Sequence, residues 1–221
     1  MTDSNGNRDP GRDDVDAQNG AMLVIISGPS GVGKDTIIDA LKLRDRDPDY
    51  HYVVTCTTRG RRPGEVDGVD YIFLDRETFA AQRAAGEFLE ASEVHENWYG
   101  TPRGQVRSAL AAGRDVILKI DVQGAAIVKG KVPGALLIFI VPPSLEDLFQ
   151  RLRSRATETA DELEVRQRNA AIELARQDDY DYVVTNETGQ VERTAKRIDE
   201  IIAAEHARHP HRRVEVYSRS P

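Results

Sequence analysis

The chain has 221 residues and a formal net charge of −7, with 39% hydrophobic and 30% charged residues. This length and composition suit one soluble globular domain with a full core, and the negative charge argues against a general nucleic-acid binder. The single cysteine, Cys56, excludes an internal disulfide and a multi-cysteine metal site; we interpret it as a small buried strand residue. No apolar run approaches the roughly 20 residues that span a bilayer. We therefore expect a cytoplasmic protein that binds neither membranes nor nucleic acid.

Both ends of the chain are polar. Residues 1–20 are rich in Asp, Asn and Gly and poor in large apolar residues. Such a segment cannot bury enough surface to offset the entropy lost on ordering, so a disordered acidic tail is predicted there. A second tail is predicted over 209–221, in which 214–217 either pairs as a short edge strand or trails. One folded domain is expected over 21–208.

Between the tails, strand patterns alternate with helix patterns. The predicted strands cover 22–27, 52–57, 71–74, 88–93, the neighbourhood of 98–101, 116–121, 135–141 and 182–185. The first predicted helix follows the loop after the first strand and ends at about residue 43. The other predicted helices cover 77–85, 103–112, 144 to about 155, 161–177 and 191–208. Such alternation indicates an α/β fold in which a parallel sheet lies between helices. The denser β pattern from about 55 to 101 indicates an insert of different character.

The first strand leads directly into a glycine-rich turn that ends in a lysine. The turn reads Gly28-Pro29-Ser30-Gly31-Val32-Gly33-Lys34 and matches the phosphate-binding pattern G-x-x-x-x-G-K. The glycines permit backbone angles at which several N–H groups converge on one anion, and the lysine adds a positive charge. The following helix points its N-terminal dipole at the same place. The loop predicts a site for nucleotide phosphates and does not by itself name the substrate.

A second basic segment lies between residues 55 and 71. It places Arg59, Arg62, Glu65 and Tyr71 around two glycine turns. A guanidinium group binds phosphate through two parallel hydrogen bonds, and a tyrosine hydroxyl can add another donor, so we interpret the segment as a second phosphate site. Two interpretations of Glu65 stay open: it contacts the substrate, or it orients Arg62.

With these segments the sequence closely resembles guanylate kinases. The matching stretches are SGPSGVGK, TTRGRRPGEVDGVDY, GEFLEASEVHENWYGTP, IDVQGA, VPPSLEDLFQRLRSRATET and YVVTN, which span about residues 23 to 190. The resemblance implies a three-layer P-loop NTPase fold with a central parallel sheet, a mixed, β-rich GMP-binding part (about 55–103) and a helical lid (about 143–165). It also implies Mg²⁺-dependent transfer of the γ-phosphoryl group of ATP to GMP, and to dGMP, in purine nucleotide metabolism. A monomer or a homodimer is expected.

The resemblance implies three groups of site residues. Those implied for GMP are Thr55, Arg59, Arg62, Tyr71, Glu90, Tyr99, Thr101 and Asp121. Those implied for ATP are Gly28, Pro29, Ser30, Gly31, Val32, Gly33, Lys34, Asp35, Thr36 and Asn186. Those implied as catalytic, at the transferring phosphoryl group, are Lys34, Arg151, Arg155 and Arg166. Chemistry supports Glu90 as a base contact, because guanine N1–H and its 2-amino group donate to a carboxylate whereas adenine has no donor at that edge. Thr101 can donate to guanine O6.

Two positions depart from the pattern. Asp35 stands where the loop usually has a Ser or Thr whose hydroxyl binds Mg²⁺. Lys119 stands where many guanylate kinases carry an acidic residue. Three hypotheses stay open: Asp35 pairs with Lys119, Asp35 ligates Mg²⁺ itself, or Asp35 only complements the positive end of the helix dipole.

Two rival functions also fit parts of the sequence. One is a related kinase that acts on another phosphorylated small molecule, such as a ribose bisphosphate; the guanine-reading pair Glu90 and Thr101 argues against it. The other is a guanylate-kinase-like protein-binding module that has lost catalysis. Such modules typically degrade the phosphate loop, whereas Gly28, Gly33 and Lys34 are all present here.

Overall fold

The computed structural model describes residues 20–44, 50–94, 96–153, 160–210, 212 and 214–216. The acidic tail predicted over 1–20 lies outside this part except for Gly20, and most of the tail predicted over 209–221 lies outside it too. Residues 214–216 belong to no strand, and Val216 is buried against the core. Among the described helices, none combines the length and the hydropathy needed to cross a membrane.

A five-stranded parallel sheet forms the centre of the molecule, as predicted. Its strand order is β2-β7-β1-β8-β9, with bounds β1 (Leu23–Ser27), β2 (His51–Tyr52), β7 (Val116–Lys119), β8 (Leu136–Val141) and β9 (Tyr182–Thr185). Ile26, near the end of β1, lies opposite Lys119 on one side and Ile138 on the other. Because all five strands run the same way, the loops after β1 and β7 emerge at the same edge of the sheet.

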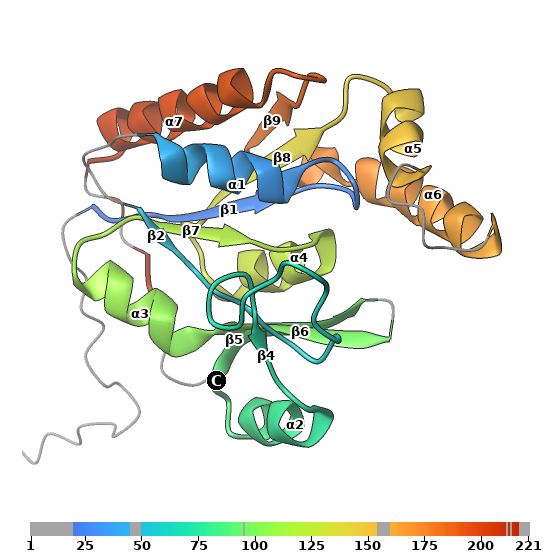
Figure 1. Ribbon diagram of the computed structural model, residues 1–221. Coiled ribbons are helices and arrows are strands. Elements are labelled where there is room, and N and C mark those ends of the chain that lie inside the picture. The colour runs from blue at the N-terminus through green and yellow to red at the C-terminus, as the bar shows by residue number, and fades with distance from the viewer. Residues whose placement is uncertain are drawn as a thin grey trace, which may run out of the picture.

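Helices cover both faces of this sheet. They are α1 (Lys34–Leu43), α3 (Arg103–Ala111), α4 (Val122–Lys131) and α7 (Val191–Arg208). Successive strand residues point to opposite faces: Val24 and Ile26 belong to the cluster under α1 and α7, whereas Leu23 and Ile25 belong to the cluster with α3 and α4. Figure 1 shows α1 and α7 on one side of the sheet and α3 and α4 on the other. The three-layer α/β architecture expected from the sequence is confirmed.

The β-rich insert folds as a second sheet. Its mixed order is β4-β3-β6-β5, with bounds β3 (Cys56–Thr57), β4 (Ile72–Phe73), β5 (Phe88–Val94) and β6 (Asn97–Pro102). The helix α2 (Arg76–Ala84) packs Phe79 on Phe88, with ring centroids 4.6 Å apart. Cys56 is a buried strand residue, as predicted, and burial raises its pKa to about 11, so it is an unreactive thiol at neutral pH.

The single strand predicted over 52–57 is wrong, because the chain changes sheets there. β2 pairs with β7 in the central sheet and β3 pairs with β6 in the second one. At the crossing point the side chain of Gln105 takes the place of a neighbouring strand: its amide accepts from Val54 N–H and donates to Val54 O, both at 3.0 Å. Both backbone groups of Val54, between the two sheets, are thereby satisfied by a residue of α3.

The helix α4 is missing from the sequence prediction. Gly124 and Gly130 lower its intrinsic helix propensity, and its apolar residues follow no single stripe. Asp121 compensates at the N-terminus, where its side chain accepts a hydrogen bond from Gly124 N–H at 2.7 Å.

Two further helices lie beside the loop that follows β1. They are α5 (Leu145–Arg153) and α6 (Ala160–Leu174), and a short 3-10 turn (Gln177–Asp179) follows them. Figure 1 shows both helices at the edge of the sheet where β1 ends. The helix predicted to reach 177 therefore ends three residues earlier and the chain tightens into the 3-10 turn.

Candidate active site

The glycine-rich loop connects β1 to α1 with a backbone that only glycine tolerates. Gly28 has φ 144° and Gly33 has φ 98°. A Cβ atom on Gly28 would lie 2.4 Å from the carbonyl oxygen of Ile140, and one on Gly33 would lie 2.7 Å from Asn186 Nδ2. Both glycines are therefore required by conformation and by close approach.

Lys34 lies folded over this loop. Its Nζ donates to the carbonyl oxygens of Gly28 at 2.6 Å and Pro29 at 3.1 Å. Burial lowers the pKa of the ammonium from its usual value, with Glu173 acting in the opposite direction. A half-buried cation whose neighbours are loop carbonyls is suited to exchange these carbonyls for the oxygens of an anion.

Helix α6 brings two charged side chains to the loop. Arg166 donates to Ser30 Oγ at 3.1 Å, and Ser30 N–H donates to Glu173 Oε2 at 2.9 Å. Arg166 is among the residues predicted from the sequence, whereas Glu173 is not. The spacing held a signal, because residues seven apart lie on one face of a helix, two turns from each other.

A cavity of about 590 Å³ joins the loop to the second sheet. The predicted site residues that line it are Gly28, Ser30, Gly31, Gly33, Lys34, Asp35, Thr55, Arg59, Arg62, Tyr71, Glu90, Tyr99, Asp121 and Arg166. Lining residues not predicted as site residues include Ser92, Asn97, Lys119 and Glu173. The predicted residues Pro29, Val32, Thr36, Thr101, Arg151 and Asn186 are outside the lining, and Arg155 lies outside the described residues.

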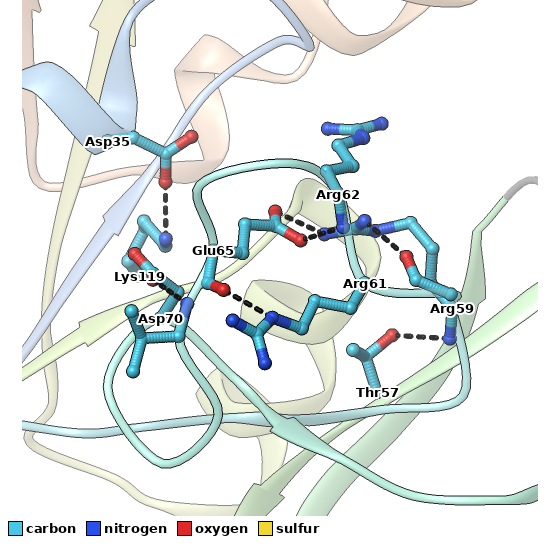
Figure 2. Close-up of polar contacts among 10 residues, drawn as sticks. Asp35, Thr57, Arg59, Arg61, Arg62, Glu65, Asp70 and Lys119 are labelled. Carbon is cyan, nitrogen blue, oxygen red and sulfur yellow. Dashed lines mark hydrogen bonds and ion pairs between the residues drawn. The ribbon is translucent and has the colours of Figure 1, made fainter.

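Arg59 is fixed by Glu65, as Figure 2 shows, and by neighbouring aromatic rings. Its guanidinium donates to Glu65 Oε1 at 2.6 Å and lies 5.4 Å from the centre of the Tyr71 ring. The same carboxylate accepts from the backbone N–H of Arg62 at 2.7 Å, and the Arg62 guanidinium points away from it in Figure 2. Burial opposes charge on Glu65, but Arg59 outweighs it and holds the pKa of this carboxyl below its usual value. Glu65 therefore positions the Arg59 side chain and the Arg62 backbone.

Glu90, on β5, is a buried carboxyl in the lining of the cavity. It is 2% exposed, and its Oε1 accepts from Thr101 Oγ1 at 2.6 Å. Its Oε2 has no hydrogen-bond partner among the described residues. Burial raises the pKa of Glu90 to about 7. The hydroxyl proton of Thr101 is used by Glu90, and the remaining carboxylate oxygen is available to a donor that enters the cavity.

Arg151 and Asn186 lie behind the loop. Arg151 donates to the carbonyl oxygens of Val32 at 3.1 Å and Asn186 at 3.0 Å. The Asn186 amide donates to Val32 O at 2.8 Å and accepts from Thr194 Oγ1 at 3.1 Å. Both side chains support the loop from outside the cavity, and their roles toward ATP stay predictions.

Comparison with known proteins identifies the family. Residues 20–205 match the family model described as guanylate kinase. The chain belongs to the guanylate kinase family. It is 43% identical to the guanylate kinase of Latilactobacillus sakei over 87% of this chain and 93% of that protein. It is 46% identical to the guanylate kinase of Streptococcus agalactiae over 85% of this chain and 88% of that protein. The crystal structure of guanylate kinase from Anaplasma phagocytophilum matches with a TM-score of 0.69 and 33% identity, covering 86% of this chain and 88% of that one.

In this guanylate kinase family member, the two unusual residues form an ion pair. Lys119 Nζ donates to Asp35 Oδ1, as Figure 2 shows. This observation confirms the pairing hypothesis; a metal-binding role of Asp35 stays a prediction. Within the described residues, no group of three or more His, Cys, Asp or Glu side chains is arranged to hold a metal ion.

Gly124 offers a test of how tightly Glu90 is held. A Cβ atom there would lie 3.0 Å from Glu90 Oε2 and 3.3 Å from Asp121 Oδ1, so the Glu90 carboxylate must give way by a few tenths of an ångström. We expect Gly124→Ala to raise the KM for GMP about 3- to 10-fold with little change in kcat, because the base contact is displaced and the transferring group is not. Steady-state kinetics at varied GMP measures this.

Gly130→Ala is the matched control, because it lies on the same helix and an added Cβ meets nothing within 4 Å. It is expected to raise the free energy of unfolding by up to about 1 kcal/mol through helix propensity and to leave the KM for GMP unchanged. An unchanged KM in both variants would show that Glu90 adjusts freely and has no strict position.

Proposed function

We propose that the chain catalyses the Mg²⁺-dependent transfer of the γ-phosphoryl group of ATP to GMP, giving ADP and GDP. The observation that carries the proposal is that Lys34 of the phosphate loop and the acceptor residues Arg59, Tyr71 and Glu90 line one cavity. Membership of the guanylate kinase family supports it. dGMP is included as a substrate, since none of the proposed contacts requires the 2′-hydroxyl.

The acceptor site reads both ends of GMP. Glu90 Oε2 accepts hydrogen bonds from the guanine N1–H and 2-amino group, with Thr55 and Asp121 close by in the cavity lining. Adenine would leave this buried carboxylate unpaired, which is the physical basis of discrimination. The phosphate of GMP is held by the guanidinium groups and phenols of Arg59, Arg62, Tyr71 and Tyr99.

The donor site supplies positive charge. Phosphoryl transfer proceeds through a transition state whose charge is spread over the moving group, so positioned cations do most of the catalysis. Lys34 and Arg166 line the cavity, and Arg151 and Arg155 are proposed to join them. The acceptor phosphate is already an anion, so no general base is required.

Mg²⁺ is proposed to arrive with ATP, bound mainly by phosphate oxygens and water. Asp35, directly after the loop in the first turn of α1, has a carboxylate whose chemistry fits the ion. When bound, the metal neutralises charge on the phosphates.

A GMP-binding part over about 55–103 and a lid over about 143–165 are proposed to close on the core. Closure would exclude water and so suppress hydrolysis of ATP. The expected cytoplasmic location, and the choice between monomer and homodimer, rest on the sequence alone.

The deciding experiment is a coupled ADP-release assay with ATP and Mg²⁺. GMP and dGMP are expected to support turnover, whereas AMP, CMP, UMP and a ribose bisphosphate are expected to support none. Turnover with the ribose bisphosphate instead would favour the sugar-phosphate kinase. A folded protein that binds GMP and turns over no acceptor would favour the protein-binding module.

A further inference from the structure

The ion pair between Asp35 and Lys119 connects the two halves of the cavity. Asp35 lies in the first turn of α1, directly after the phosphate loop, and Lys119 ends β7 at the same edge of the sheet. Both side chains line the cavity. Figure 2 shows the pair beside the segment that carries Arg59, Arg62 and Glu65.

Lys119 shares a neighbour with the acceptor arginine. Its Nζ lies 5.1 Å from the centre of the Tyr71 ring, and the Arg59 guanidinium lies 5.4 Å from the same centre. The cations proposed to hold the acceptor phosphate therefore continue past Tyr71 toward the phosphate loop. Lys119 is the member of this row that is closest to the loop, because its partner Asp35 follows Lys34 in sequence.

The ammonium of Lys119 is held as a cation. Its side chain is 23% exposed, and burial alone would favour the neutral form. Asp35 and Tyr71 outweigh burial and keep the pKa of Lys119 above its usual value. An ammonium has three N–H donors, so hydrogen bonding to Asp35 and Tyr71 leaves one for an oxygen of a phosphate.

We propose that Lys119 binds the acceptor phosphate on the side that faces the donor phosphates, and that Asp35 is its positioning residue. The proposal rests on the proposed function and deepens it at the same site. Two anionic phosphates repel each other as they approach, and a positive charge between them reduces that repulsion.

The pair also explains why a carboxylate is tolerated next to the loop. Asp35 without a partner would place a negative charge beside the phosphates, in a position where a neutral hydroxyl is usual. Lys119 cancels that charge. Removing Lys119 alone should therefore do more harm than removing both charged groups, since the single change leaves Asp35 to repel the phosphate.

Calorimetric titration of GMP and of guanosine, without ATP or Mg²⁺, tests the proposal. Lys119→Met is expected to weaken GMP binding about 10- to 100-fold and to leave guanosine, which lacks the phosphate, unchanged. The double variant Asp35→Ser/Lys119→Met is expected to recover most of the lost affinity. Lys196→Met is the matched control, because Lys196 is an exposed lysine on α7 with its own acidic neighbour, Glu200, at 3.8 Å; its affinities should equal those of the wild type.

Several outcomes would overturn the proposal. An equal loss for GMP and guanosine would mean that Lys119 supports the fold of the site and makes no phosphate contact. An unchanged GMP affinity would remove Lys119 from the site. Additive effects of Asp35→Ser and Lys119→Met on GMP affinity would remove the positioning role of Asp35. The same role would be removed if Asp35→Ser shifted the Mg²⁺ dependence of turnover and left the GMP affinity unchanged.

Two controls keep these outcomes distinct. Lys119→Arg keeps the charge and should retain more GMP affinity than Lys119→Met, and thermal unfolding of each variant checks that it is folded. The proposed function is measured separately by ADP release in the wild type. A wild type that binds GMP but makes no ADP would overturn the proposed function and leave the phosphate contact standing.

Discussion

Lys34→Met is expected to lower kcat with ATP and GMP by about 100- to 1,000-fold. The reason is electrostatic: methionine matches the length of lysine but cannot stabilise the charge that develops on the transferring phosphoryl group. In the structure the ammonium lies over the loop, on the carbonyl oxygens of Gly28 and Pro29. The coupled ADP-release assay at saturating substrates measures the loss.

This variant should fold normally. Burial disfavours the charged form of Lys34, so an uncharged side chain of similar volume removes that penalty while it loses two hydrogen bonds to the loop. Lys42→Met is the control, because it lies on the same helix with an exposed side chain away from the loop; its kcat should equal that of the wild type. A kcat for Lys34→Met within about threefold of the control would remove Lys34 from the catalytic group.

Local patterns were sufficient to predict the loop and the central sheet. The phosphate-binding sequence follows an apolar strand and precedes a helix, and those three features fix the backbone through short-range conformational preferences. The alternating faces of β1 follow from the period of a strand, so both core layers were predictable as well.

The features that were missed depend on distant partners. The division of the segment 52–57 between two sheets rests on Gln105, about 50 residues away in the chain. The helix α4 forms despite two glycines because Asp121 caps it and the core covers it. Periodicity and propensity do not report either interaction.

The features of the site also divide into those that the sequence predicts and those that depend on residues distant in the chain. The chemistry of Glu90 and Arg59 could be inferred from residue types and resemblance. The buried environment of Glu90, the Glu65 partner of Arg59 and the contact of Glu173 with Ser30 come from packing. The ion pair between Asp35 and Lys119 was predictable. Lys119 ends β7, Asp35 follows the loop after β1, and these two parallel strands are neighbours whose carboxyl ends meet at one edge of the sheet.

Glu90 makes GMP binding depend on pH. Burial raises its pKa to about 7 in the free protein, so this carboxyl takes up a proton as the pH falls through neutrality. The guanine N–H donors require an ionised acceptor. GMP affinity is therefore expected to rise with pH up to about 7 and then level off, falling about tenfold per unit at lower pH. Titration calorimetry from pH 5.5 to 8.5 measures it.

Glu90→Gln separates this effect from the titration of the GMP phosphate itself. The amide cannot ionise, and its NH₂ group opposes the guanine donors, so kcat/KM for GMP should fall about 100-fold or more. The contribution of Glu90 to the pH profile should vanish, while the phosphate contribution stays in both proteins. Identical pH profiles for the wild type and the variant would contradict the role of Glu90 as the ionised acceptor.

Stability gives an independent measurement on the ligand-free protein. The pKa of Glu90 lies at about 7 when folded and at its ordinary value of 4.5 when unfolded, so between these pH values the folded state holds the proton more strongly. The contribution of this group to the free energy of unfolding therefore falls as pH rises from about 4.5 to about 7 and is constant above that. Glu90→Gln lacks this term, so its stability relative to wild type should be higher at pH 8 than at pH 5. GMP should raise the free energy of unfolding of the wild type more than that of the variant at pH 8. In the wild type, the guanine N–H groups donate to the ionised carboxylate and so offset the cost of burying its charge.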